Sequence, residues 1–161
     1  MPDEATLVVI KPDAIQRGLM GAVLARLEEL RLEIVGAKAM RVSRELAETH
    51  YEQLREKPFF NDAVAHLQGT LHGVPTVLAM VFRGPDAIRR VREVTGATNP
   101  EKADPRSIRG QFGRNTAAGL MENVLHASAN AQDAQREIAL WFEPRELLKP
   151  VLQPAKRTET R

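Results

Sequence analysis

The 161 residues carry a formal net charge of +2, and 43% of them are hydrophobic and 27% charged, as in an ordinary globular domain. The absence of cysteine excludes disulfides, zinc ribbons and thiol catalysis, and an aromatic content of 4% disfavours nucleic acid, whose bases usually stack on aromatic rings. No apolar run approaches the ~18 residues of a membrane span, and the N-terminus lacks the basic region of a signal peptide, so we expect a cytoplasmic protein that contacts no membrane.

The first half of the chain alternates strand and helix patterns. A β-branched run before Lys11 predicts a buried strand, and Pro12 and Asp13 are expected to break it. Apolar residues then recur at helical spacing, and Ser43 is a favourable N-cap for a later helix. We expect strands over 6–10 and 32–42, and helices over 18–30, 43–54 and 58–67.

The second half contains the strongest strand pattern and one long irregular segment. Gly84, Pro85 and Asp86 predict the start of a helix, with the proline near its first turn. Loops as long as 96–115 are usually functional or disordered. We expect a loop over 69–75, a strand over 76–82, a short strand within 123–128 and a helix over 131–142 with an Asn130–Asp133 cap.

This order of elements favours a compact α/β sandwich of the βαββαβ type with its helices on one face of the sheet. We expect one domain over residues 1–148, followed by a polar tail over 149–161. The sequence contains no P-loop, no G-x-G-x-x-G after a strand and no H-E-x-x-H motif. Binding of a metal by the protein itself is therefore not expected.

His126 is the first candidate for chemistry, in the stretch NVLHAS. A histidine after an apolar run is most often a packed core residue, and a metal ligand or a reacting group are the alternatives. Ser128 lies close in sequence, and Glu137 can reach His126 if its helix packs on the strand. Imidazole is mostly neutral near pH 7, so it can act as a nucleophile whose tautomer a carboxylate fixes.

Other side chains have both a structural and a functional interpretation. Lys11 at a strand end is either an ordinary surface cation or a phosphate contact. Arg92 and Arg109 belong either to a solvated basic face or to a ligand site, and the position of Arg109 in an irregular segment favours the site. Phe59 can stack on a base if Phe60 is the buried member of the pair, and Tyr51 can direct its hydroxyl to a polar site.

Six stretches of the sequence, taken in order from about Thr6 to Leu147, resemble the nucleoside diphosphate kinase family. One stretch alone is weak, but six in the same order are far more specific. The stretches are KPDAIQRGLMG (11–21), HYEQLREKPFF (50–60), GATNP (96–100), SIRGQF (107–112), NVLHAS (123–128) and REIALWF (136–142).

The resemblance implies a ferredoxin-like βαββαβ fold, with a four-stranded antiparallel sheet on which helices pack, and assembly as a homo-oligomer, a hexamer or a tetramer. It implies transfer of the γ-phosphate of a nucleoside triphosphate such as ATP to a nucleoside diphosphate, in a ping-pong reaction through a phosphohistidine. Mg²⁺ is expected on the nucleotide phosphates rather than on protein ligands. The alternative is an inactive nucleotide- or nucleic-acid-binding relative, but no matched position is missing.

The resemblance also assigns roles to individual residues. His126 is expected to accept the phosphate, with Ser128 and Glu137 orienting it and Tyr51 beside it. The expected nucleotide contacts are Lys11 and Asn123 at the sugar and phosphates, Arg92, Thr98 and Arg109 at the phosphates, and Phe59 on the base.

The chain departs from the family pattern in four respects. Residues 110–122 and the loop 68–75 are longer than is common, and Met-Glu-Asn at 121–123 replaces the usual Gly-Arg-Asn before the histidine motif. Ala129 stands where an aspartate is common. These departures bear on loop geometry and assembly more than on the histidine.

Overall fold

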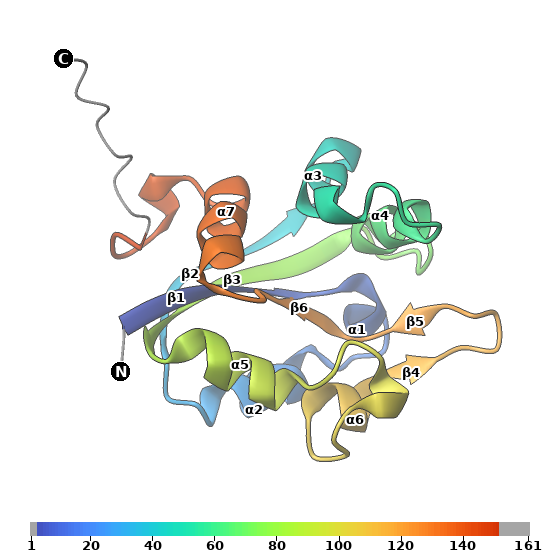
Figure 1. The fold of residues 1–161 in the computed structure, drawn as a ribbon, viewed down its shortest axis with the longest axis horizontal. Coiled ribbons are helices and arrows are strands. Elements are labelled where there is room, and N and C mark those ends of the chain that lie inside the picture. Colours follow the sequence, from blue (N-terminus) through green and yellow to red (C-terminus); the bar gives the residue numbers. More distant parts are fainter. Residues whose placement is uncertain (1–2, 152–161) are drawn as a thin grey trace.

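The computed structural model describes residues 3–151, in which helices pack on a central sheet (Figure 1). The strands are β1 (Asp3–Ile10), β2 (Glu33–Arg41), β3 (Thr76–Pro85), β4 (Arg114–Asn115), β5 (Met121–Glu122) and β6 (Leu125–Ala127). The helices are α1 (Pro12–Gln16), α2 (Met20–Glu28), α3 (Arg44–His50), α4 (Phe60–Gln68), α5 (Ala87–Thr95), α6 (Ile108–Phe112) and α7 (Ala131–Trp141), with 3-10 turns at Glu52–Leu54, Pro100–Lys102 and Pro144–Glu146.

The central sheet has four strands in the order β2-β3-β1-β6, and every neighbouring pair is antiparallel. This confirms the predicted four-stranded antiparallel, ferredoxin-like architecture. In the β1–β6 pair, Val9 lies opposite His126, so the histidine is next to the central strand. β4 and β5 form a separate short hairpin that projects from the body (Figure 1).

Helices cover both faces of the sheet, so the prediction that they lie on one face is wrong. Leu7 and Val9 of β1 belong to a core with residues of α3, α4 and α7, whereas Val8 and Ile10 belong to a second core with residues of α1, α2, α5 and α6. Figure 1 shows the two layers above and below the sheet. A continuous apolar run such as that of β1 is typical of a strand buried on both faces.

The predicted end of the first strand is confirmed, because β1 ends at Ile10. Pro12 then occupies the first turn of α1, a helix that the sequence analysis did not predict, and a proline is tolerated there because its missing N–H has no helical partner. Two later boundaries differ from the predictions. Pro85 ends β3 rather than starting α5, which begins at Ala87 after Asp86 with a left-handed φ of 52°. The irregular segment 96–115 contains α6, which is too short to show a period in the sequence.

Both predicted helix caps are confirmed. The Ser43 side chain accepts a hydrogen bond from the Leu46 amide, and the Asn130 side chain accepts one from the Asp133 amide. At the start of the predicted tail, Lys149 pairs with Glu33 at 2.8 Å; the prediction for 152–161 lies outside the described residues. Within residues 3–151, no helix has the length and apolar character that crossing a membrane requires.

Candidate active site

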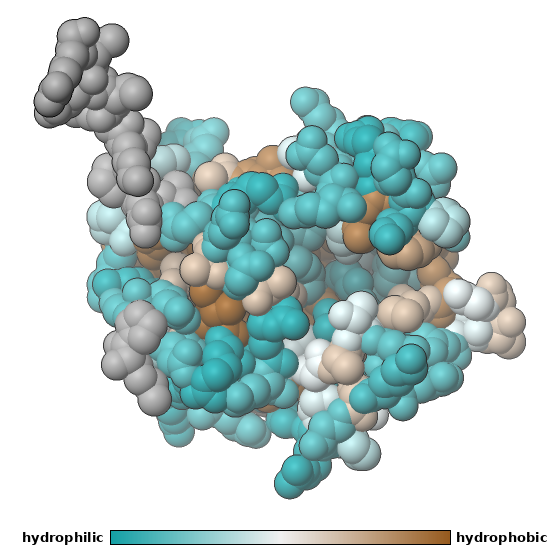
Figure 2. All heavy atoms as spheres, viewed as in Figure 1, coloured by the Kyte–Doolittle hydropathy of each residue, from teal (hydrophilic) through white to brown (hydrophobic). Residues whose placement is uncertain are grey.

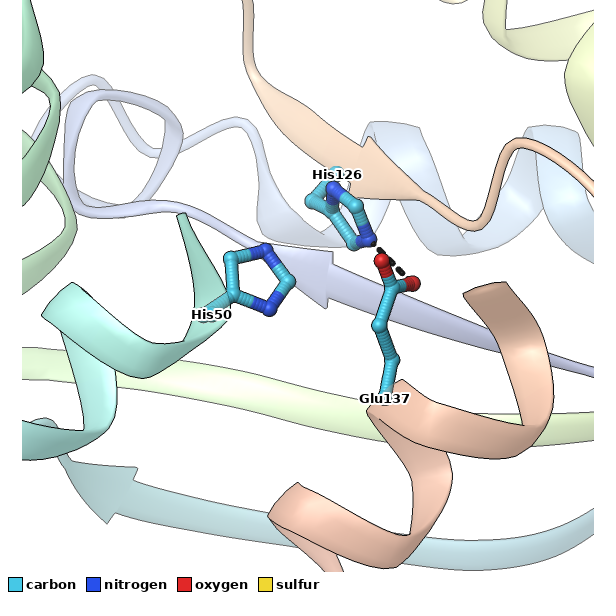
Figure 3. Close-up of side chains that lie close together, drawn as sticks. All are labelled: His50, His126 and Glu137. Atoms are coloured by element: carbon cyan, nitrogen blue, oxygen red, sulfur yellow. Dashed lines mark hydrogen bonds and ion pairs between the residues drawn. The ribbon is translucent and has the colours of Figure 1, made fainter. Parts of the chain in front are cut away.

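His126 on β6 and Glu137 on α7 form the centre of the candidate site (Figure 3). Helix α7 packs against β1, and this brings the carboxylate Oε1 of Glu137 to 2.8 Å from Nε2 of His126. The same oxygen accepts a hydrogen bond from the Ser128 hydroxyl at 2.7 Å. The structure therefore brings together the three residues that the sequence grouped around the histidine.

The protonation of this cluster follows from its hydrogen bonds. Burial tends to raise the pKa of Glu137, but the hydrogen bonds from His126 and Ser128 outweigh it and lower the pKa below its usual value. An ionised carboxylate only accepts hydrogen bonds, so Nε2 of His126 must carry the proton. In a neutral ring, Nδ1 then keeps its lone pair, and Figure 3 shows that nitrogen directed away from Glu137.

His50 at the end of α3 is a site residue that the sequence analysis missed. Its ring lies edge to face against that of His126, with centroids 4.4 Å apart and planes at 82°, and its Nδ1 accepts a hydrogen bond from the Trp141 indole at 3.0 Å. Burial and the neighbouring positive charges hold the pKa of His50 well below its usual value, so the ring is neutral. The spacing of His50 from Ala47, one helical turn earlier, was the available signal of an inward side chain.

Lys11 lies at the end of β1, almost fully buried with 6% exposure. Its ammonium donates a hydrogen bond to the side-chain oxygen of Asn123. Burial lowers the pKa of Lys11 to about 8; Asp13 opposes this effect and Arg109 adds to it. The two residues assigned to the sugar and phosphates are therefore in contact, and burial removes the ammonium of Lys11 from most of its water.

Arg109 on α6 binds the backbone of the segment that precedes the histidine. Its three guanidinium nitrogens donate to the carbonyls of Asn123, Gly96 and Leu125 at 3.1, 3.1 and 2.7 Å. Burial lowers the pKa of Arg109 to about 10, with the charge of Arg92 adding to this and Tyr51 opposing it. In this state the arginine fixes the loop 96–98 to the strand that carries His126.

Thr98 and Arg92, two further predicted nucleotide contacts, are more exposed to solvent than Lys11 and Arg109. Thr98 is exposed, and its carbonyl accepts a hydrogen bond from the Asn123 side chain at 3.1 Å. Arg92 is exposed on α5, where it lines a surface cavity with Gly96. Among residues 3–151, neither side chain has a hydrogen-bond partner that would hold it away from a ligand at the edge of the candidate site.

Phe59 and Phe60 divide as the sequence predicts. Phe60 is buried in the core with 8% exposure, whereas Phe59 at the start of α4 is 49% exposed.

Tyr51 contacts His50 with ring centroids 4.8 Å apart, and burial raises the pKa of its hydroxyl to about 12. Figure 2 shows this face of the molecule hollowed between the α3–α4 side and the part that contains α6 and the β4–β5 hairpin.

The described residues contain one cluster with metal-ligand chemistry, formed by His50, His126 and Glu137, whose ligand atoms lie within 4.8 Å of one another. It supplies two imidazoles and one carboxylate, and that carboxylate already accepts two hydrogen bonds. Mg²⁺ prefers oxygen ligands in octahedral geometry, so the cluster does not suit Mg²⁺.

Comparison with known proteins points to one family. The model of the family described as nucleoside diphosphate kinase matches residues 4–147. A nucleoside diphosphate kinase of Thermus thermophilus is 49% identical over 145 residues, which cover 90% of this chain and 99% of the relative. One of Pyrococcus horikoshii is 46% identical over 146 residues, or 91% of this chain and 89% of the relative.

Solved structures of the same family resemble the fold of this chain. The nucleoside diphosphate kinase of Halobacterium salinarum in complex with CDP superposes with a TM-score of 0.81 at 42% identity, covering 92% of this chain and 93% of that one. A transition-state mimic of the Borrelia burgdorferi enzyme with vanadate and ADP gives 0.82 at 34% identity, with 92% of each chain covered. Fold, site and matches define a nucleotide phosphotransferase. The chain belongs to the nucleoside diphosphate kinase family.

Proposed function

We propose that this chain moves the γ-phosphate of a nucleoside triphosphate such as ATP to a nucleoside diphosphate through a phosphohistidine on His126. The observation that carries the proposal is the hydrogen bond from His126 Nε2 to an ionised Glu137, which leaves Nδ1 as a nucleophile without any further base. The family's nucleoside diphosphate kinase activity supports it.

In the first half-reaction, the Nδ1 lone pair attacks the γ-phosphorus and forms a P–N bond. The bond from phosphorus to the oxygen that bridges the β- and γ-phosphates breaks, and the nucleoside diphosphate leaves with that electron pair. The Nε2 proton stays in the hydrogen bond to Glu137, which stabilises the positive charge that develops on the ring. In the second half-reaction, a β-phosphate oxygen of another diphosphate attacks the phosphorus, and Nδ1 leaves with its lone pair.

The cations would stabilise the charge on the transferring group, since phosphoryl transfer depends mostly on positioning and electrostatics. Lys11 would contact the phosphates as a point charge, with Arg92, Thr98 and Arg109 around them and Asn123 beside Lys11. Phe59 would stack on the base, which its 49% exposure permits. Ser128 would orient Glu137 through its hydrogen bond, and Tyr51 would pack beside His50 and so support the position of His126.

Mg²⁺ would be held by the nucleotide phosphates and water, because the side chains that surround the proposed phosphate position are cationic or amide groups rather than free carboxylates. Both carboxylate oxygens of the nearby Asp13 already accept hydrogen bonds, from His66 and from the Val124 amide. The ion would neutralise phosphate charge.

Incubation of the purified protein with ATP labelled at the γ-phosphate tests the proposal. We expect a phosphoprotein that is labile to acid and stable to base, and release of the label as nucleoside triphosphate when an unlabelled nucleoside diphosphate is added. A protein that turns over nucleotides without ever taking the label would exclude the covalent route.

We further infer a homo-oligomer, a hexamer or a tetramer, in the cytoplasm. Strand β2 lies at an edge of the sheet, where the Leu148 amide covers the Val35 carbonyl, and Ile34 of β2 is 42% exposed. The rest of this edge and the exposed apolar side chain support an additional interface, because such surfaces are usually covered. Light scattering of the purified protein would give the number of subunits.

A further inference from the structure

Two segments that depart from the family pattern contact each other through a buried hydrogen bond between a histidine and a glutamate. His72 lies in the loop 69–75, and Glu122 lies on β5 of the hairpin that makes residues 110–122 long. Their side chains are nearly inaccessible, and His72 Nε2 lies 3.0 Å from Oε1 of Glu122. The second carboxylate oxygen of Glu122 accepts a hydrogen bond from Arg114 of β4 at 2.6 Å. Hydrogen bonds of Glu122 therefore connect the loop 69–75 to the β4–β5 hairpin.

The residues that follow Glu122 in the sequence belong to the candidate site. Glu122 is followed by Asn123, which contacts Lys11, and then by Val124, which has a φ of +74°. The Leu125 amide donates to the Asn123 carbonyl at 2.8 Å, so residues 123–125 form a three-residue turn. A β-branched residue is unfavourable at positive φ, and such a turn persists only where the surroundings hold it.

The turn is held from both sides. On one side, Asp13 accepts the Val124 amide with one carboxylate oxygen at 3.0 Å and His66 with the other at 2.7 Å. On the other side stands the His72–Glu122 pair, and the rings of His66 and His72 meet with centroids 4.9 Å apart. The contacts therefore run without a break from Asp13 to the hairpin.

We propose that His72 and Glu122 are positioning residues that place the Asn123 amide for the sugar of the nucleotide. An uncharged amide suits a sugar hydroxyl, whereas the ammonium of Lys11 suits a phosphate. The proposal rests on the nucleotide-binding role proposed above for Asn123. His126 does not depend on this pair, because pairing with β1 and the bond to Glu137 hold it.

If His72 and Glu122 affect the sugar contact but not His126, their role can be tested with two phosphate donors. ATP needs the sugar contact, whereas phosphoramidate is a small donor that carries a phosphoryl group and no sugar. The rate of His126 phosphorylation by each donor, and the KM and kcat with ATP, would be measured in wild type, His72→Ala and His72→Gln. Thr70→Ala is the matched control in the same loop, since its hydroxyl contacts only the Ala65 carbonyl within the described residues.

For His72→Ala we expect a KM for ATP that is about tenfold higher, with a smaller change in kcat, because one buried hydrogen bond to a charged group is lost. Phosphorylation by phosphoramidate should stay within about twofold of wild type. His72→Gln restores a donor toward Glu122 and should recover most of the affinity, and Thr70→Ala should behave as wild type.

Equal losses with both donors, or no loss with either, would overturn the positioning role. Circular dichroism would verify folding; if His72→Ala does not fold, Glu122→Gln carries the same test, because it keeps the volume and removes the charge. Wild type separates the two proposals. If wild type takes no phosphate from either donor, the covalent function fails; if wild type is labelled but the variants show no difference between donors, only the inference about His72 and Glu122 fails.

Discussion

His126 and Glu137 are joined by a hydrogen bond of 2.8 Å that fixes which ring nitrogen carries the proton. The Ser128 hydroxyl donates to the same carboxylate oxygen at 2.7 Å while its own oxygen accepts from the Leu7 amide at 3.1 Å. The orientation of the imidazole is thus connected to the backbone of the central strand.

Replacing the proposed nucleophile should abolish covalent labelling. For His126→Ala we expect no acid-labile phosphate after incubation with labelled ATP, because the lone pair of His50, the other imidazole in the cluster, is held at Nδ1 by the hydrogen bond from the Trp141 indole. The side chain is only 18% exposed and donates to the buried Glu137, so the variant should melt at a lower temperature than wild type but still in one cooperative transition. A folded variant that keeps the label would place the phosphate on another residue.

Glu137→Gln should slow the reaction without removing it. The amide can replace the carboxylate in size but not in charge, so the developing imidazolium loses its partner. A hydrogen bond to a charged group contributes about 1.5–3 kcal/mol, which corresponds to a decrease in kcat of roughly 10- to 100-fold. Single-turnover labelling would measure this rate, with Gln132→Ala at the exposed start of α7 as the control. An unchanged rate would contradict the proposed role of Glu137.

Lys11 should make activity dependent on pH. Its pKa of about 8 means that the ammonium predominates below pH 8 and is lost as the pH rises through that value. Since phosphates bind the cation, kcat/KM should be level below about pH 8 and fall up to about tenfold per unit above it. In Lys11→Arg the charge persists, so the decrease near pH 8 should vanish; if both proteins give the same profile, Lys11 is not the titrating group.

The same lowered pKa predicts that Lys11 destabilises the folded protein. A change from 10.5 to about 8 means that the unfolded chain binds a proton more tightly, at a cost of about 3 kcal/mol to folding near pH 7. Stability should therefore rise with pH between about 8 and 10.5. Lys11→Met should unfold at higher urea concentration at pH 7, by about 1–3 kcal/mol after loss of the bond to Asn123, and the gain should shrink toward pH 10.5. A gain that is independent of pH would point to packing instead.

Phe59 and Phe60 form a matched pair of tests. Phe59→Ala should raise the KM for nucleotides by about tenfold and leave stability nearly unchanged, because an exposed ring stacked on a base contributes about 1–3 kcal/mol. Phe60→Ala removes a buried ring and should lower the free energy of unfolding by about 3–5 kcal/mol. Urea unfolding and steady-state kinetics distinguish the two, and a KM effect confined to Phe60→Ala would disprove stacking by Phe59.

The sequence predicted those parts of the fold that rest on local patterns. The Ser43 and Asn130 caps and the short strand around His126 are local features, and the structure contains all three. The start of α5 was predicted wrongly because a proline such as Pro85 is compatible with both the first turn of a helix and the last residue of a strand. Only the pairing of β3 with β1 decides between the two positions. Helices on both faces of the sheet are likewise a property of tertiary packing.

The candidate site was predictable to a different extent. The resemblance named the residues that lie around His126, but it did not name His50, which is far from His126 in sequence and meets it only in the folded chain. The contact between His72 and Glu122 joins two segments that the family pattern does not contain in this form, so no motif could indicate it. Such contacts require the three-dimensional structure.

Trp141, the only tryptophan in the 161 residues, donates its indole N–H to His50, and His50 lies edge to face against His126. In the proposed reaction, a phosphoryl group on His126 would bring negative charge within two contacts of the indole, and indole emission responds to nearby charge. Trp141 would then report phosphorylation optically, and each proposed half-reaction could be followed in a stopped-flow fluorimeter without labelling either nucleotide.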